Sequence, residues 1–319
     1  MSLDTRRITL TARLILLALI IPLAACSKPE KPSVSEKPAI KVFASPDDAG
    51  NALLDAAKLG DQNVVLAIFG TEAKNIIYSG DAVQDKAAVD NFTAAYSVMH
   101  RWRKMADGSQ ILLVGVDNFP FPIPLKKNGT GQWYFDALAG KDEILSRRIG
   151  RNELAVIDAC AALADAQAEY FSRRHDSASP KQYALKFISD PGKQNGLYWE
   201  SPEGKPKSPL GPLVAFATAE GYSAKANSHA PFHGYYFHML TKQGSNARGG
   251  AKDYLVNGKM VHGFALVAYP AEYGNSGVMT FIINQDGVLF QKDLGKTTTE
   301  TATALSAFDP DTGWNRVEE

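Results

Sequence analysis

Histidines gather in the second half of the chain, so a metal site is the first chemistry to consider. Four of the six fall within 34 residues: His229, His233, His238 and His262. Imidazole is a common metal ligand, but bound metals need ligands at spacings that bring them around one point. These spacings repeat no known ligand motif, and on a strand His233 and His238 would point to opposite faces. The sequence therefore predicts no metal site and no cofactor.

Charged residues are densest between residues 140 and 154. Three arginines, Arg147, Arg148 and Arg151, lie there among acidic residues. Guanidinium groups that converge could bind an anion, whereas mixed charges along one helix form ion pairs with each other. We expect a salt-bridged helix that serves as a hinge between two domains, with an anion site as the alternative.

Catalytic motifs do not identify a reaction. The chain has no Gly-x-Ser-x-Gly, His-Glu-x-x-His, phosphate-loop or paired-cysteine motif. Cys160 lies in an alanine-rich helical run without a nearby histidine, so we expect a small core residue rather than a nucleophile. The catalytic residues stay unknown, and whether the chain is an enzyme stays open, with a non-enzymatic role favoured.

A second cysteine, Cys26, closes the N-terminal segment. Arg6 and Arg7 precede an apolar run that is short for a membrane span, and Leu23-Ala24-Ala25-Cys26 follows it. This quartet resembles the bacterial lipobox, in which signal peptidase cleaves before the cysteine and lipid is attached to it. The resemblance implies a lipoprotein with a signal peptide over residues 1–25 and acyl chains such as palmitate on Cys26. Because Ser27 follows, it also implies an outer-membrane protein that faces the periplasm.

The segment after the signal is expected to be a tether over residues 26–40, because prolines among lysines and serines cannot build a core.

The whole chain has 34 basic and 34 acidic residues. Three arginines and one aspartate belong to residues 1–25, so residues 26–319 have 31 basic and 33 acidic residues. This balance excludes the basic face of a nucleic-acid-binding protein. With an acylated Cys26, Cys160 has no disulfide partner. The length favours two domains.

The first domain is expected over residues 41–148, with helices before strands. Ser45-Pro46 is a typical helix start, and apolar residues recur at helical spacing over 85–99. Strands are expected near 111–116, 121–125 and 132–135, with the last two joined as a hairpin. This order resembles the nuclear-transport-factor-type α+β fold, in which helices lie on a curved antiparallel sheet and often enclose a pocket.

Four aromatic residues are the candidates for lining such a pocket: Trp102, Phe119, Phe121 and Trp133. The alternative, which we favour, is that these side chains form the core. No Asp–His pair of the kind that transfers protons accompanies them.

The second domain is expected over residues 149–319. A long helix begins near Asn152, an irregular stretch over 177–227 with a short helix near 213–220 follows, and strands are expected near 234–237, 263–270 and 281–289. The helix and strands resemble the globular head of type IV pilins and pseudopilins, a long helix packed on an antiparallel sheet. A pilin subunit needs an apolar membrane helix just upstream, and the polar block stands there instead. The chain therefore cannot be a pilin subunit.

Four segments together resemble one bacterial envelope family over about residues 41–317. They are Phe121-Pro122-Ile123-Pro124-Leu125, Trp133-Tyr134-Phe135-Asp136, Arg147-Arg148-Ile149-Gly150-Arg151-Asn152-Glu153 and Ser208-Pro209-Leu210-Gly211-Pro212-Leu213. The family is catalogued only as a domain of unknown function, number twenty-nine fifty, and the resemblance implies no activity or site residues.

Three functions follow from these patterns. The first is a non-enzymatic protein that is held at the membrane through Cys26 and binds an envelope partner or supports an assembly. The second is a periplasmic binder of a small molecule or glycan. The third is a hydrolase without a recognisable motif, since glycan cleavage needs only two well-placed carboxylates.

Overall fold

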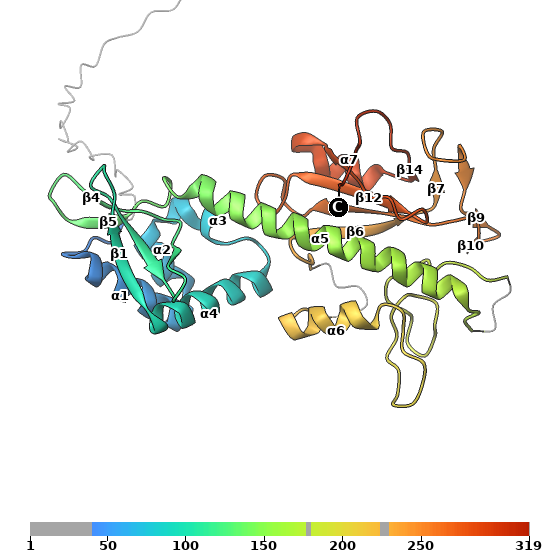
Figure 1. Ribbon diagram of the computed structural model, residues 1–319, viewed down its shortest axis with the longest axis horizontal. Helices are drawn as coiled ribbons and strands as arrows, with labels where there is room; N and C mark the ends of the chain where they lie inside the picture. The colour runs from blue at the N-terminus through green and yellow to red at the C-terminus, as the bar shows by residue number, and fades with distance from the viewer. Residues whose placement is uncertain (1–39, 177–179, 224–229, 319) are drawn as a thin grey trace, which may run out of the picture. The chain divides into compact units, whose positions relative to one another are not determined.

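A computed structural model describes residues 40–176, 180–223 and 230–318. The predicted signal peptide, Cys26, almost the whole predicted tether and His229 lie outside these residues. The described chain is an α+β structure of helices and mainly antiparallel sheets, which confirms the predicted fold class (Figure 1).

The helical elements are, in chain order, α1 (Pro46–Leu59), α2 (Gln62–Phe69), η1 (Thr71–Ala73), α3 (Lys74–Ile77), α4 (Ala82–Val98), α5 (Lys141–Ser172), α6 (Gly211–Glu220), η2 (Gly295–Thr297) and α7 (Thr298–Ala304). As predicted, the first helix begins where Ser45 accepts a hydrogen bond from the Asp48 amide, and it ends at Gly60 in the left-handed region.

The strands before α5 are β1 (His100–Lys104), β2 (Gln110–Val114), β3 (Phe119–Pro120), β4 (Leu125–Lys127) and β5 (Trp133–Phe135). They form an antiparallel sheet in the order β1-β2-β4-β5, with β3 paired to β2. The predicted hairpin is confirmed, since Leu125 of β4 pairs with Phe135 of β5. The predicted strand over 121–125 is wrong in extent, because its two prolines lack the amide donors of a ladder.

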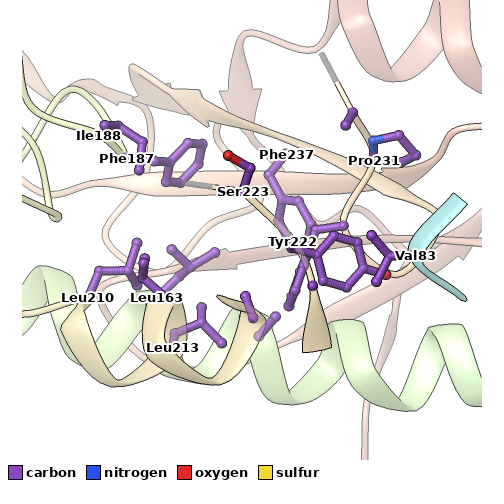
Figure 2. Close-up of a pocket in the computed structure, with 16 residues that line it drawn as sticks. Val83, Leu163, Phe187, Ile188, Leu210, Leu213, Tyr222, Ser223, Pro231 and Phe237 are labelled. Atoms are coloured by element: carbon purple, nitrogen blue, oxygen red, sulfur yellow. The ribbon is translucent and has the colours of Figure 1, made fainter. Parts of the chain in front are cut away.

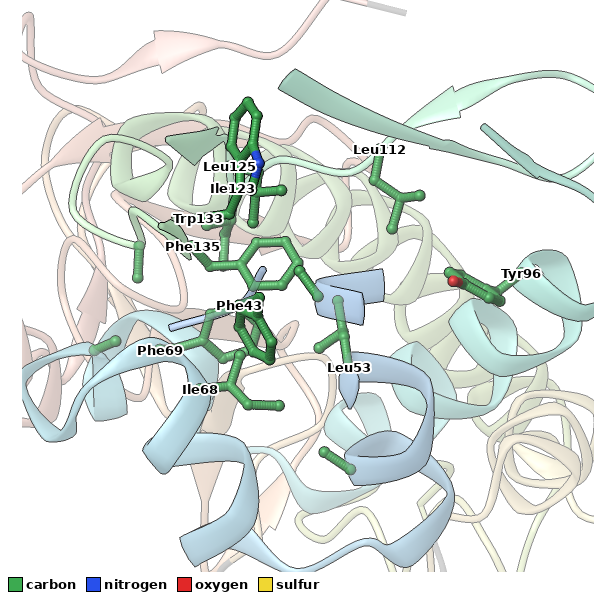
Figure 3. Close-up of a cluster of buried hydrophobic side chains, with 14 of the residues drawn as sticks. Phe43, Leu53, Ile68, Phe69, Tyr96, Leu112, Ile123, Leu125, Trp133 and Phe135 are labelled. Atoms are coloured by element: carbon green, nitrogen blue, oxygen red, sulfur yellow. The ribbon is translucent and has the colours of Figure 1, made fainter. Parts of the chain in front are cut away.

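The N-terminal core forms between this sheet and α1, α2 and α4 (Figure 3). Its largest buried side chains include Tyr96, Phe135, Ile68, Leu112 and Leu125. These apolar positions come from both the helices and the sheet, so neither layer could bury its apolar face without the other.

Helix α5 is a single helix of 32 residues, about 48 Å long, and it begins well before the predicted start near Asn152. The polar block lies inside it, and Glu143 pairs with Arg147 one turn later at 2.7 Å. The predicted salt-bridged helix is confirmed. The predicted hinge is not seen, because the helix continues through the block without a break.

The strands after α5 are β6 (Tyr235–Leu240), β7 (Lys242–Gln243), β8 (Lys252–Asp253), β9 (Leu255–Val256), β10 (Lys259–Met260), β11 (Ala265–Pro270), β12 (Met279–Asn284), β13 (Phe290–Asp293), β14 (Ala307–Phe308) and β15 (Asn315–Arg316). The C-terminal sheet has the order β15-β13-β12-β11-β6, and smaller ladders join β14-β7-β8 and β10-β9. The predicted strands near 234–237, 263–270 and 281–289 correspond to β6, β11 and β12.

Helix α5 packs on one face of the C-terminal sheet through alternate residues of its central strands. Leu266 and Phe281 join Cys160 and Leu163 in one buried cluster, whereas Val267 and its neighbours face a second cluster on the other side. The sheet is therefore covered on both faces.

The described residues belong to one compact unit, and the predicted boundary between residues 148 and 149 falls within α5. The division into two domains stays a prediction. Among the described residues, none of the helices combines the length and the apolar character that a bilayer crossing requires.

Candidate functional site

A cavity of about 380 Å³ lies between α5, α6, the loop before α6 and the start of β6. We call it the α6 cavity (Figure 2). Its lining consists of Val83, Ala159, Leu163, Phe187, Ile188, Leu210, Leu213, Val214, Ala217, Gly221, Tyr222, Ser223, Ala230, Pro231, Phe232 and Phe237. Only Tyr222 and Ser223 carry a polar side-chain atom, so the wall is almost wholly hydrocarbon.

Helix α6 forms one wall of this cavity. Its first turn contains Pro212 and is tied down where the Leu210 amide donates to the Leu197 carbonyl at 3.0 Å, and it ends at Gly221 with φ 107°. The sequence of α6 is apolar on all sides apart from Thr218 and Glu220, yet none of its residues is fully buried. A helix that is apolar on all sides is normally buried, so α6 is less buried than its composition predicts.

A buried amide holds the opposite wall. The Gln167 side chain of α5 donates to the Ala184 carbonyl at 2.8 Å and accepts from the Ala184 amide at 2.9 Å. Three residues further on, Phe187 reaches the cavity, and its carbonyl accepts the Tyr198 amide at 2.9 Å. The loop is thus fixed to α5 and to itself, so this part of the wall is built before any ligand arrives.

Polar contacts close the end of the cavity at Tyr222. The buried Asp81 carboxylate caps α4 with one oxygen and accepts the Tyr222 hydroxyl at 2.7 Å and the Gly234 amide at 3.3 Å with the other. Burial, reinforced by Asp81, raises the pKa of the Tyr222 phenol. The hydroxyl therefore stays a neutral donor to Asp81, and the ring stands as a wall of the cavity.

The turn before β6 lies next to this contact. His233 and Gly234 both have positive φ, at 47° and 71°, in a two-residue hairpin turn closed by Phe232 and Tyr235. Positive φ is unusual for histidine, and His233 Nε2 lies 3.0 Å from Glu220 Oε2 at the end of α6. This pair joins the end of α6 to the turn.

Cys160 is not available to this cavity as a nucleophile. Cys160 is close in sequence to the lining residue Ala159, but its side chain is fully buried, and burial raises the pKa of its thiol. A buried, protonated thiol is inert, which confirms Cys160 as a core residue. Within the described ranges, no three metal-ligating side chains come together.

The four aromatic candidates lie in or near the N-terminal core. Trp133 is buried in it, Trp102 and Phe121 are partly buried against it, and Phe119 is 56% exposed beneath the Arg147 guanidinium. None of them lines the α6 cavity. Ligand binding by these four residues stays a prediction.

The arginines of the polar block bind protein groups. Arg148 is buried and donates to the Asn275 side chain and to the Ile76 carbonyl, the latter at 2.6 Å. Arg147 donates to the Pro120 carbonyl at 2.8 Å. With these two guanidinium groups engaged in this way, the alternative of an anion site in the block loses its principal donors.

Comparison with known proteins identifies the family. The model of the family described as "Protein of unknown function (DUF2950)" matches residues 40–317. The chain belongs to this family. Neither the curated proteins nor the solved structures contain a match. The family resemblance drawn from the sequence is confirmed, and the similarity to pilin heads is not.

Sequence reasoning did not find the α6 cavity of this DUF2950 chain. The long irregular stretch over 177–227 was a signal, and Ser208-Pro209-Leu210-Gly211-Pro212-Leu213 carries part of the cavity wall. The other walls come from α5 and β6, and no local pattern reveals that these distant segments leave space between them.

Proposed function

We propose that this protein is a lipid-anchored envelope protein that binds a small apolar molecule in the α6 cavity. The observation that carries the proposal is a preformed hydrocarbon-lined space beneath a helix that is apolar on all sides. The Cys26 anchor and the outer-membrane location, facing the periplasm, are part of the proposal and rest on the sequence.

The size of the cavity suits a ligand rather than a packing defect. Ligand sites typically measure about 300–1,000 Å³ and are mostly apolar, and a cavity of about 150 Å³ already accepts one benzene ring. At about 380 Å³, the α6 cavity has room for roughly fifteen carbon atoms, close to the size of a three-ring aromatic molecule.

Two alanines of α6 allow a matched test. Ala217 lines the cavity, whereas Ala219 is exposed and does not. The test titrates N-phenyl-1-naphthylamine, a neutral probe that fluoresces in apolar surroundings, into the full chain. We expect Ala217→Phe to fill the space and weaken binding about tenfold or more, and Ala219→Phe to bind within about twofold of wild type. Equal binding by both variants contradicts the proposal.

A second candidate is binding of an envelope partner, with support of an assembly. The outer side of α6 favours it, since the large apolar side chain of Phe216 is 57% exposed there. In-cell crosslinking followed by affinity purification tests this role, with Phe216→Asp compared with wild type. A specific partner that Phe216→Asp loses supports it, and an unchanged set of captured proteins counts against it.

A further inference from the structure

A second cavity, of about 160 Å³, lies at the C-terminal end of α5. We call it the basic cavity. Its lining consists of Glu169, Arg173, Arg174, His175, Gln194, Trp199, Pro206, Lys207 and Pro209. Three fixed cations, Arg173, Arg174 and Lys207, therefore face one carboxylate, and Trp199 and the prolines supply an apolar wall.

These cations are not needed to complete the helix end. Lys181 Nζ donates to the Ser172 carbonyl at 2.5 Å, and the Arg173 backbone amide donates to the Tyr170 carbonyl at 3.3 Å. Both contacts satisfy carbonyl groups that the last turn leaves open. The guanidinium groups of Arg173 and Arg174 are therefore not used to complete the end of α5.

Carboxylates offset part of this charge. Arg173 lies 3.7 Å from Glu169, and both side chains are largely exposed. The Asp176 carboxylate accepts the amide of the lining residue Gln194 at 2.8 Å. Across residues 40–176, 180–223 and 230–318, Arg174 and Lys207 form no ion pair. The basic cavity thus keeps an excess of positive charge.

The floor of the basic cavity is ordered by His175, which is 8% exposed. Its ring stacks on Tyr170 with 3.9 Å between centroids, and its Nε2 lies 3.0 Å from the Tyr170 carbonyl oxygen. The Tyr170 hydroxyl in turn donates to the Gln194 carbonyl at 2.6 Å. These contacts hold the loop that carries Trp199 close to the arginines.

The basic cavity and the α6 cavity follow each other along the same elements. Leu210 lines the α6 cavity and its neighbour Pro209 lines the basic cavity. On α5, Leu163 belongs to the first and Glu169 to the second, a rise of about 9 Å. The two linings have no residue in common and adjoin at Pro209 and Leu210, so the hydrocarbon site and the cationic site are neighbours along this loop.

We infer that the ligand is an anionic amphiphile, with its alkyl chain in the α6 cavity and its carboxylate or phosphate at Arg173, Arg174 and Lys207. This inference rests on the proposed function and adds the chemical class of the ligand. Arginine binds both kinds of anion through paired N–H donors, and lysine adds a point charge.

The test measures displacement of N-phenyl-1-naphthylamine by decanoate, decyl phosphate and decanol from the full chain carrying Cys26→Ser, so that no acyl chain on the protein competes. We expect decanoate or decyl phosphate to bind about tenfold or more tightly than decanol. Preference for one anion over the other separates a fatty acid from a phosphate-bearing lipid. The variant Arg173→Gln/Arg174→Gln/Lys207→Gln should lose the preference and bind decanol as before.

A matched control removes the same charges elsewhere. Arg101→Gln/Arg103→Gln/Lys104→Gln changes three exposed residues of β1 and should keep the preference. Equal affinity of wild type for acid and alcohol, or a preference that survives in the cavity variant, overturns the inference and leaves the proposed function standing. Decanol binding that is unaffected by Ala217→Phe overturns the proposed function itself.

Discussion

At the scale of single residues, Arg148 is a buried charge with several partners. The residue is 5% exposed, and its guanidinium donates to Asn275, Ile76 and Ile77, which lie far from it in sequence. Burial lowers its pKa, and the nearby Asp85 opposes that effect. Such a charge is stable only while its acceptors are in place.

Removing the Arg148 side chain should lower the stability of the folded protein. We expect Arg148→Ala to lower the free energy of unfolding by about 2–4 kcal/mol, because several buried acceptors lose their donor. Arg151, three positions later and exposed, is the control, and Arg151→Ala should change the free energy of unfolding by less than about 0.5 kcal/mol. Urea unfolding followed by circular dichroism measures both. A loss below about 1 kcal/mol for Arg148→Ala would show that the contacts to Asn275 and Ile76 are replaceable.

The sequence predicted residue types better than residue partners. Cys160 was predicted as a core residue because its neighbours are small and apolar, and that is where it lies. The arginines at 147, 148 and 151 look equivalent in the sequence, yet one is buried, one is part-buried and one is exposed. The difference depends on Asn275 and Ile76, which no local pattern connects to Arg148.

At the scale of elements, α5 contains Gly150 in its interior, and the structure gives this glycine no special role. Its φ is not positive, and an added Cβ would meet no atom within 4 Å. Glycine inside a helix is less stable than alanine by about 0.5–1 kcal/mol.

We therefore expect Gly150→Ala to raise the free energy of unfolding by about 0.5–1 kcal/mol, with the midpoint of thermal or urea unfolding as the measurement. Gly140 is the contrasting position, because a Cβ there would lie 2.7 Å from the Pro122 carbonyl oxygen, and Gly140→Ala should destabilise the protein. If Gly150→Ala leaves stability unchanged or lowers it, the residue has a constraint, such as the predicted hinge, that the continuous helix does not reveal.

Helices and hairpins were the predictable elements, for local reasons. Ser45-Pro46 fixes the start of α1. The Asn128 side chain shapes the turn of the hairpin β4–β5, because its oxygen accepts the Thr130 and Gln132 amides at 3.0 and 2.9 Å. The start of α5 was placed too late, because a polar block of mixed charge has the composition of a surface segment. Tertiary contacts of Arg148 and Asn152 keep that block helical and inside the structure.

At the scale of the whole molecule, the proposed membrane location rests on the proposed lipidation of Cys26. We expect Cys26→Ser to abolish metabolic labelling with palmitate and to shift the protein from the membrane fraction to the soluble fraction, because a protein without acyl chains has no anchor. Cys160→Ala is the control and should keep both properties, since that thiol is buried. Fractionation with fluorography checks both variants. Palmitate labelling that persists in Cys26→Ser would contradict the lipobox interpretation.

The α+β class and the family were predictable because they depend on element order and on local segments. The α6 cavity was not, because its walls come from α4, α5, α6 and β6. Its volume depends on how side chains as many as 154 positions apart, Val83 and Phe237, leave the space between them unfilled. Periodicity can identify an apolar face, but it does not show what that face meets.

The long-range contacts of α5 also set an order of events while the chain is synthesised and folds. Asn275 lies 127 positions after Arg148, and the amides bound by Glu153 lie 125 and 126 positions after it. A chain that emerges from its N-terminus can close the core around α1, α2 and β5 early, because those contacts are nearer in sequence. Arg148, Asn152 and Glu153 must wait for the final quarter of the chain. A translation stop or a protease cut before Asn275 would therefore leave Asn152 and Glu153 without these partners and Arg148 without Asn275, and the fragment should be an early target for proteolysis.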